Sequence, residues 1–391
     1  MSNNEVVVIG GGYAGVMAAN RLTQRDDVRV TLINPRRVFV PRLRLHQLVG
    51  GTHDAVVDYR DVLAEGVRLV TDSVTRIDPA GRTVELADGD SIGYDYLIYA
   101  VGSGTPAPKV PGAAEFAYPV VTLEAAKRLR SVLFDTPTSA AVTVIGGGPT
   151  GIETAAELAG QGREVTLVCG SVLVPYLHPK ARRTAHKYLA KLGVRVIEGT
   201  DVIAVARDAV ELGDGRTLAS EVTIWAAGFG VPDLAARSGL SVDAAGRLLT
   251  DETLTSIDDE RIVAAGDSSA PSDLPFRMSA YTAYCLGAHA ADTVLHRIAG
   301  QPPAPIDLAF PAMCLSFGRD AGIYQLGHKD ETAMRLYFAG AVGKKLKEFA
   351  CEAGINHLAT EARKPGSHHW FSDGKHRPAL LQEQRTAAPV A

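Results

Sequence analysis

The stretch VVVIGGGYAG occupies residues 6–15 and sets the expectation for the whole chain. Its first four residues are β-branched, in a run too short for a helix and typical of a buried parallel strand. Gly10, Gly12 and Gly15 follow at once in G-x-G-x-x-G spacing. The first glycine permits a tight turn, the second lets the backbone approach a pyrophosphate, and the third lets the next helix pack close to the strand. The N-terminus of that helix would face the phosphates, so the stretch predicts a nucleotide pocket.

A second copy of the pattern, VIGGGPTG at residues 144–151, lies 136 residues further on. Its glycines are Gly146, Gly148 and Gly151. The segment LIYAVGSGTP at 97–106 is likewise echoed by TIWAAGFGVP at 223–232. One glycine motif can arise by chance, whereas a repeated motif with matching neighbours predicts an α/β fold with two Rossmann-like dinucleotide-binding domains.

Composition excludes several classes of function. The 391 residues, 46% of them hydrophobic, suffice for two or three domains, and the net charge of −4 gives no reason to expect a nucleic-acid partner. The four cysteines form no C-x-x-C pair and no cluster with histidine, so we expect free thiols, no metal site and no dithiol relay. No apolar run approaches ~18 residues and the first strand begins near the N-terminus, so we expect a cytoplasmic protein with neither a signal peptide nor a spanning helix.

Two residues stand where strands of the two domains end. Asn34 follows the strand expected at Val28–Ile33, at a position where an acid usually binds an adenosine ribose. Asparagine can hydrogen-bond hydroxyls there, and it can equally form a turn before a proline. Cys169 ends the matching strand of the second domain and is either part of that nucleotide site or a small buried residue.

Two charged residues near the glycine loops have both a functional and a structural interpretation. Arg42 lies in the segment Phe39–Gly51, which is expected to be irregular and could pass over a cofactor or form a solvated edge. Glu153 lies on the first turn of the helix after the second glycine loop. A helix N-terminus stabilises a carboxylate, while its place at the mouth of the pocket supports a catalytic role equally well.

The strand RIVAAGD, residues 261–267, ends in Gly266–Asp267. A carboxylate at this point suits the hydroxyls of a ribityl chain. A helix is expected at Ser279–Ile298, and its N-terminus would stabilise negative charge on a reduced flavin. Tyr281 and Tyr284 near its start could stack on a flat acceptor and hydrogen-bond a quinone carbonyl, or could simply be packing residues.

The last 90 or so residues are expected to form a third structural region. Strands are expected within Ile306–Leu326 and at Met334–Phe338. The piece Gly343–Phe349 carries lysines at 344, 345 and 347 beside apolar residues, and either contacts a bilayer or forms a solvated surface. The tail after Arg363 is polar and is expected to be loosely ordered.

Taken together, GGGYAG, YAVGS, GGGPTGIE, WAAGFG and AAGD resemble, in that order, the flavoproteins with two dinucleotide-binding domains. Within that group, AYTAYCLGAHAA and SFGRDAGIYQ are similar to segments of type II NADH dehydrogenases and ferroptosis-suppressor-like quinone reductases. The chain departs from the type II dehydrogenases in carrying Tyr281 where they usually have glutamine, and in lacking a membrane-binding helical hairpin.

The resemblance implies an NAD(P)H domain inserted into a FAD domain. The expected divisions are a FAD domain at 1–112 and 233–303, an NAD(P)H domain at 113–232 and a C-terminal α+β region at 304–391. The implied cofactor-binding residues are Gly10, Gly12, Gly15, Asn34, Arg42, Gly102, Gly266, Asp267 and Ala280 for FAD, and Gly146, Gly148, Gly151, Cys169 and Gly228 for NAD(P)H.

The implied reaction passes hydride from NAD(P)H to FAD and electrons to a quinone, with Glu153 and Tyr281 as catalytic residues. A homodimer and a peripheral contact with the inner face of a membrane are further expectations. The alternatives are a ferredoxin reductase, a tailoring flavoenzyme for a secondary metabolite, or an apoptosis-inducing-factor-like protein that senses NAD(H).

Overall fold

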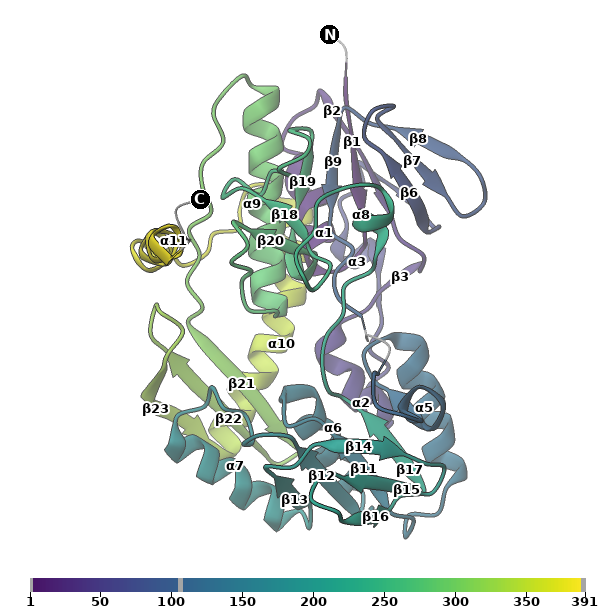
Figure 1. The fold of residues 1–391 in the computed structure, drawn as a ribbon. Helices are drawn as coiled ribbons and strands as arrows, with labels where there is room; N and C mark the ends of the chain where they lie inside the picture. Colours follow the sequence, from purple (N-terminus) through teal and green to yellow (C-terminus); the bar gives the residue numbers. More distant parts are fainter. Residues whose placement is uncertain (1–2, 105–107, 388–391) are drawn as a thin grey trace.

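The computed structural model describes residues 3–104 and 108–387. Two five-stranded parallel sheets lie near opposite ends of the molecule, and the C-terminal elements lie beside both (Figure 1). These sheets confirm the predicted α/β class with two Rossmann-like units. Thr105 and Pro106, at the end of the first repeated segment, lie outside the described residues.

The first unit is a parallel sheet in the order β19-β9-β1-β2-β5. Val6 and Val8 of its central strand point into a core shared with two long helices, whereas Val7 and Ile9 point into a second core on the other face. Burial on both faces explains why the sequence of this strand is continuously apolar. The elements are β1 (Asn4–Ile9), β2 (Val28–Ile33), β5 (Val67–Val70), β9 (Tyr96–Tyr99), β19 (Ile262–Ala264), α1 (Tyr13–Leu22) and α9 (Ala280–Ile298), with an antiparallel meander of β6 (Val74–Asp78), β7 (Thr83–Leu86) and β8 (Ser91–Gly93).

The second unit repeats this plan in the order β10-β17-β11-β12-β13. It also has one core against helices and another against a meander. The elements are β10 (Ala117–Pro119), β11 (Val142–Ile145), β12 (Val165–Cys169), β13 (Arg195–Glu198), β17 (Val222–Trp225), α5 (Leu123–Asp135), α6 (Pro149–Ala159) and α7 (Pro179–Lys191), with a meander of β14 (Val202–Val205), β15 (Ala209–Leu212) and β16 (Thr217–Ala219).

Shorter elements complete and connect the units. Most of the segment Phe39–Gly51 is helical rather than irregular, because the 3-10 helix η1 (Arg42–Arg44) leads into α2 (Leu45–Val49), which buries its apolar side on α5 and α6. The remaining short elements are β3 (Val38–Phe39), β4 (Val57–Asp58), α3 (Tyr59–Val62), α4 (Ala113–Phe116), α8 (Leu234–Arg237), β18 (Leu248–Thr250), η2 (Gly266–Ser268) and β20 (Ser269–Pro271).

The C-terminal region is an antiparallel sheet followed by a long helix. The lysine-rich piece at 343–349 belongs to this helix, α10 (Gly340–Arg363), which runs between the C-terminal sheet and the first unit (Figure 1). Two glycines let it approach closely: a Cβ on Gly343 would lie 2.3 Å from the Gly322 carbonyl oxygen, and one on Gly354 would lie 3.2 Å from the Tyr13 ring. The other elements are β21 (Ala312–Phe317), β22 (Ala321–Gly327), β23 (Ala333–Ala339) and α11 (His376–Ala387).

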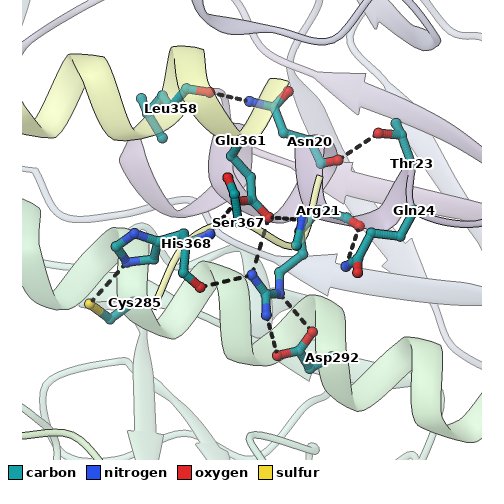
Figure 2. Close-up of polar contacts among 11 residues, drawn as sticks. Asn20, Arg21, Thr23, Gln24, Cys285, Asp292, Leu358, Glu361, Ser367 and His368 are labelled. Atoms are coloured by element: carbon teal, nitrogen blue, oxygen red, sulfur yellow. Dashed lines mark hydrogen bonds and ion pairs between the residues drawn. The ribbon is translucent and has the colours of Figure 1, made fainter. Parts of the chain in front are cut away.

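The expectation of a loosely ordered tail after Arg363 is wrong for the described residues. Figure 2 shows the reason: the Arg21 guanidinium on α1 donates to Asp292 of α9, to Glu361 of α10 and to the His368 carbonyl. Glu361 is fully buried and also accepts backbone N–H bonds from Gly366 and His368. A buried charge needs such partners, so this network fixes the start of the tail to the first unit.

Further along, Arg377 of α11 pairs with Glu252 at 2.6 Å and stacks on the Phe276 ring at 4.1 Å. The local sequence around Arg377 does not predict these two contacts, because Glu252 and Phe276 lie far away in the chain.

Candidate cofactor and acceptor site

The first glycine loop has the shape that a phosphate requires. Gly10 has φ of 105°, and a Cβ on Gly15 would lie 1.8 Å from the Gly10 carbonyl oxygen, so neither position admits a side chain. A Cβ on Gly12 would meet no atom within 4 Å, because this side of the loop is open. Gly12 is also the N-cap of α1, which has no side-chain cap and no acidic residue in its first turn. The free N–H groups of α1 therefore fit an anion such as the pyrophosphate of a dinucleotide.

Asn34 fixes the position of this loop through hydrogen bonds of its side-chain amide. Its Oδ1 accepts a hydrogen bond from the Gly11 N–H at 3.0 Å, and its Nδ2 donates to the Arg36 carbonyl at 2.8 Å. Tyr59 donates from its hydroxyl to the Gly11 carbonyl at 2.8 Å. Asn34 thus positions the glycine loop, and its binding of a ribose stays a prediction.

Three polar residues meet at the open edge of the same sheet. Arg42 Nη1 donates to the Ser103 carbonyl at 2.9 Å and lies 3.0 Å from Ser103 Oγ. Ser103 Oγ donates to Asp267 Oδ2 at 2.6 Å, which lies 3.9 Å from Arg42 Nη1. Burial lowers the pKa of Arg42, although Asp267 opposes that effect. The sequence-predicted pair Arg42 and Asp267 is therefore brought together, and Ser103, which follows Gly102, was missed.

The N-terminus of α9 lies next to this group. Ser279 caps it by accepting from the Thr282 N–H at 3.0 Å, and Ala280 begins the helix. A Cβ on Gly266 would lie 3.1 Å from the Ala14 methyl carbon and 3.8 Å from that of Ala283, so η2, α1 and α9 converge here. The strand end and two helix N-termini thus enclose a site with donors, acceptors and an uncapped dipole, which fits the phosphates and hydroxyls of a flavin dinucleotide.

The second glycine loop repeats the geometry of the first. Gly146 has φ of 128°, and a Cβ on Gly151 would lie 2.0 Å from the Gly146 carbonyl oxygen. Gly148 is the N-cap of α6, again without a side-chain cap, and its open side meets only the Tyr176 hydroxyl at 3.9 Å from a built Cβ. This loop also fits a dinucleotide pyrophosphate.

Cys169 packs against the back of the second loop. Only 1% of its surface is exposed, and its Sγ lies 2.6 Å from where a Cβ on Gly147 would be. Burial raises the pKa of this thiol to about 12, with the Glu198 carboxylate adding to the effect, so Cys169 is a neutral packing group. All four cysteines of the chain are free. The roles of Cys169 and Gly228 in nucleotide binding stay predictions.

Glu153 is not an open acid at the mouth of the pocket. It is 5% exposed, and its Oε1 lies 2.8 Å from the Lys347 ammonium of α10 and accepts from the Ser316 N–H and Oγ at 2.9 and 3.0 Å. His46 Nδ1 lies 3.6 Å from the other oxygen. Burial raises the pKa of Glu153, but Lys347, with smaller contributions from His46 and the Ser316 N–H, outweighs burial and the net pKa is lowered. Burial lowers the pKa of His46 to about 4, so its imidazole is neutral at pH 7.

Lys347 was predicted to belong to a basic surface stretch, and that prediction is wrong. It is 3% exposed and compensates the charge of Glu153, whose opposing field raises the lysine pKa despite burial. No feature of the sequence around Lys347 distinguishes it from Lys344 and Lys345, because the pairing depends on where α10 crosses α6 and β21.

Tyr281 and Tyr284 belong to an aromatic group that extends from the first glycine loop. The ring of Tyr284 lies 5.5 Å from that of Tyr281, 6.5 Å from Tyr13 and 5.1 Å from His368. Tyr284 is 7% exposed and Tyr281 is half-buried. Tyr13, which sequence reasoning missed although it lies inside GGGYAG, has a buried hydroxyl with no partner among the described residues. The catalytic role assigned to Tyr281 stays a prediction.

Among the described residues, no helix is long and apolar enough to cross a membrane.

A family model for pyridine nucleotide-disulphide oxidoreductases matches residues 4–285, from the first strand to the start of α9. The chain belongs to this family. It is 30% identical over 371 residues to an NADH dehydrogenase-like protein of Mycobacterium tuberculosis, covering 88% of this chain and 92% of that protein. It is 26% identical to a type II NADH:quinone oxidoreductase of Staphylococcus haemolyticus over 85% of this chain and 92% of that protein.

Solved structures agree in fold. A sulfide:quinone oxidoreductase of Aquifex aeolicus superimposes with a TM-score of 0.79 at 20% identity, covering 93% of each chain. NDH2 of Plasmodium falciparum in complex with NADH gives a TM-score of 0.75 at 15% identity, over 94% of this chain and 99% of that one. The predicted class of a flavoprotein oxidoreductase with FAD and NAD(P)H as cofactors is confirmed.

Proposed function

We propose that this chain is a FAD-dependent NAD(P)H:quinone oxidoreductase. The observation that carries the proposal is a pair of open glycine loops, of which the first lies beside the Arg42–Ser103–Asp267 group and the N-terminus of α9. FAD belongs at the first loop and NAD(P)H at the second. Division of the chain at residues 112, 232 and 303 forms part of the same proposal.

The bound flavin supplies the redox chemistry by accepting hydride from the nicotinamide and passing electrons on. The residues of the chain bind the two cofactors and orient them. Asp267 accepts a hydrogen bond from Ser103, lies near the positive charge of Arg42, and would accept hydrogen bonds from the ribityl hydroxyls. The N-termini of α1 and α9 would stabilise negative charge on the cofactor.

Glu153 acts in this proposal as half of a buried neutral pair rather than as a free carboxylate. Its pairing with Lys347 leaves no uncompensated charge behind the second glycine loop, where the neutral dihydronicotinamide of NAD(P)H would approach. The Ser316 bonds fix the carboxylate in one orientation. The pair thereby positions α6 and α10 relative to each other.

The functions of several relatives support a quinone as the acceptor. Besides the staphylococcal enzyme, a demethylphylloquinone reductase of Synechocystis is 26% identical over 81% of this chain and 85% of that protein. The half-buried Tyr281 provides aromatic surface for a flat acceptor at the start of α9, and the buried Tyr284 packs edge-on against it.

The test is steady-state oxidation of NADH and NADPH with ubiquinone and menaquinone analogues, ferredoxin and oxygen. Quinone-dependent turnover at rates of at least about 1 s⁻¹ supports the proposal. Turnover with ferredoxin alone would identify a ferredoxin reductase. A persistent charge-transfer band with negligible turnover would instead support a protein that senses NAD(H).

Membrane contact is the second part of the proposal. Val342, Lys345 and Phe349 share one face of α10 by their spacing of three and four residues, and all three are exposed. Leu336 and Phe338 are exposed on the adjoining strand β23. An apolar face with a lysine fits the interface of an anionic bilayer, where quinones dissolve.

Co-sedimentation with phosphatidylglycerol vesicles tests this contact. Val342→Glu with Phe349→Glu should abolish binding, whereas Phe134→Glu, on the 88%-exposed phenyl of α5, should leave it unchanged. Equal binding by all three proteins would exclude this surface. Light scattering on the same samples tests the predicted homodimer.

A further inference from the structure

Arg277 lies where three parts of the molecule meet. Its guanidinium carbon is 5.2 Å from the ring centre of Tyr176, in the connection between β12 and α7 of the second unit. The same carbon is 4.8 Å from the ring centre of Phe310, and Arg277 Nη2 lies 3.0 Å from Glu331 Oε2 in the turn between β22 and β23. The two aromatic rings and the carboxylate therefore hold the guanidinium plane in one place.

This place lies between the two predicted cofactor sites. Arg277 precedes the N-cap of α9, Ser279, by two residues, and α9 begins beside Asp267. Its stacking partner Tyr176 has its hydroxyl 3.9 Å from a Cβ built on Gly148, over the open side of the second glycine loop. A dinucleotide with its phosphates at Gly148 and its nicotinamide near α9 must pass this side chain.

We propose that Arg277 recognises the diphosphate of the bound pyridine nucleotide, with Tyr176 covering the glycine loop beside it. This inference rests on the proposed function and adds a positioning residue from outside the second unit. Dianionic diphosphate is the ligand class, because a planar guanidinium with several parallel N–H groups matches two phosphate oxygens.

The Glu331 pair does not prevent this exchange. Its two side chains are 28% and 30% exposed, and partly exposed ion pairs contribute little free energy. Glu331 itself has φ of 62°, a conformation that residues other than glycine rarely adopt, so the turn accepts strain at the position that presents this carboxylate. Glu331 holds the guanidinium beside the glycine loop and is displaced by the diphosphate, which carries two charges and offers more oxygens to the guanidinium N–H groups.

The experiment compares the FAD-loaded wild type with Arg277→Ala, Arg277→Lys, Glu331→Gln and Arg183→Ala. Arg183 is exposed on α7 of the second unit, and Arg183→Ala removes the same charge as Arg277→Ala, so it is the matched control. NADH is compared with reduced nicotinamide riboside, which carries no phosphate. ADP-ribose binding by calorimetry gives a readout that does not depend on turnover.

Arg277→Ala should raise the KM for NADH about ten-fold, with kcat within two-fold, and should weaken ADP-ribose binding equally. Activity with the riboside should not change. Arg277→Lys should weaken ADP-ribose binding about three-fold, whereas Glu331→Gln should bind ADP-ribose more tightly than the wild type, because the guanidinium no longer exchanges a carboxylate partner. Arg183→Ala should have the same KM for NADH and the same affinity for ADP-ribose as the wild type.

Equal losses with NADH and the riboside would show that Arg277 only holds the units together, and would overturn the inference. Unchanged KM and ADP-ribose affinity in Arg277→Ala would do the same. If Arg277→Ala does not fold, Arg277→Lys and Glu331→Gln must still move ADP-ribose affinity in opposite directions. A wild type that oxidises neither NADH nor NADPH would refute the proposed function instead.

Discussion

The two Rossmann-like units share the arrangement of four strands, β9-β1-β2-β5 and β17-β11-β12-β13, and nearly the same glycine geometry. Their fifth strands differ, because β19 follows the other strands of its unit in the chain and β10 precedes them, and their sites are also completed from different places. In the first unit, Asp267 follows its own strand β19 and meets Ser103 after β9. In the second, the buried carboxylate of Glu153 is compensated by Lys347 from α10. A duplicated backbone therefore supplies two phosphate cradles, and side chains brought by non-equivalent segments give them different chemistry.

The residues at the ends of β2 and β12 also differ in chemistry between the two units. Asn34 holds the middle glycine of its loop by a hydrogen bond to the Gly11 N–H, whereas Cys169 holds Gly147 by packing alone. The same mechanical task is performed by a polar contact in one unit and an apolar contact in the other. Each of the following predictions compares the units by changing one feature.

The largest effect is expected where the units are most alike. Gly15→Ala and Gly151→Ala each place a Cβ at 2.0 Å or less from a backbone carbonyl oxygen, so each should lose at least about 4 kcal/mol of folding free energy or fail to fold. Gly12→Ala meets no atom and should change stability by less than about 1 kcal/mol. Urea unfolding measures all three. A small loss of folding free energy in Gly151→Ala, beside a large loss in Gly15→Ala, would show that the second loop is less tightly packed than the first.

Lys347→Met should cost about 3 kcal/mol at pH 7, because it leaves the buried Glu153 charge uncompensated. The double variant with Glu153→Gln removes both charges and should recover most of that loss. Chemical denaturation of the two variants provides the comparison, and equal losses in both would mean that Lys347 contributes packing only.

The pH dependence of Lys347→Met sharpens the same test. In the wild type the pKa of Glu153 is lowered, so its stabilisation is present above the usual glutamate value of 4.5 and is lost as pH falls through the lowered folded value. Without Lys347, burial lacks its main opposing effect and the pKa of Glu153 is higher than in the wild type, so the variant should regain stability relative to the wild type as the pH falls toward 4.5. A pH-independent difference would contradict the assignment of a buried ion pair.

Asp267→Ala tests the first unit with a smaller expected effect. Buried ribityl hydroxyls would lose their acceptor, so FAD affinity should fall by about 2 kcal/mol, or about 30-fold. Asp267→Asn keeps the Ser103 contact and should lose less. Flavin absorbance after dialysis measures occupancy, and full occupancy in Asp267→Ala would remove this residue from the FAD site.

The smallest effect is expected at the end of β12. Cys169 carries no charge at pH 7 and no arginine replaces it, so NADH and NADPH should differ in kcat/KM by less than about 100-fold, or about 2.7 kcal/mol. Cys169→Ala should leave that ratio unchanged. A wild-type preference above this limit would show that a charged group from outside β12 selects the nucleotide.

Several features could be predicted from the sequence because they depend on local backbone geometry. The glycine spacing at 10–15 and 146–151 requires a strand, a tight turn and a closely packed helix, and β2 begins and ends at Val28 and Ile33 as expected. The acid at the end of RIVAAGD does lie beside Ser103 and Arg42, because the carboxyl ends of parallel strands meet at one edge of a sheet, and its binding of FAD stays a prediction. Those signals lie within a few residues of one another.

The pairing of Glu153 with Lys347, the anchoring of the tail through Arg21 and the placement of Arg277 beside Tyr176 were decided by the tertiary structure alone. Each joins residues from elements far apart in the chain, and nothing in the sequence near either partner records the other. The sequence by itself thus determined the two dinucleotide folds, since steric limits on the backbone act over a single turn. Only the packed chain determined which charges are buried and paired, because desolvation and Coulomb attraction depend on neighbours that packing brings within a few ångströms.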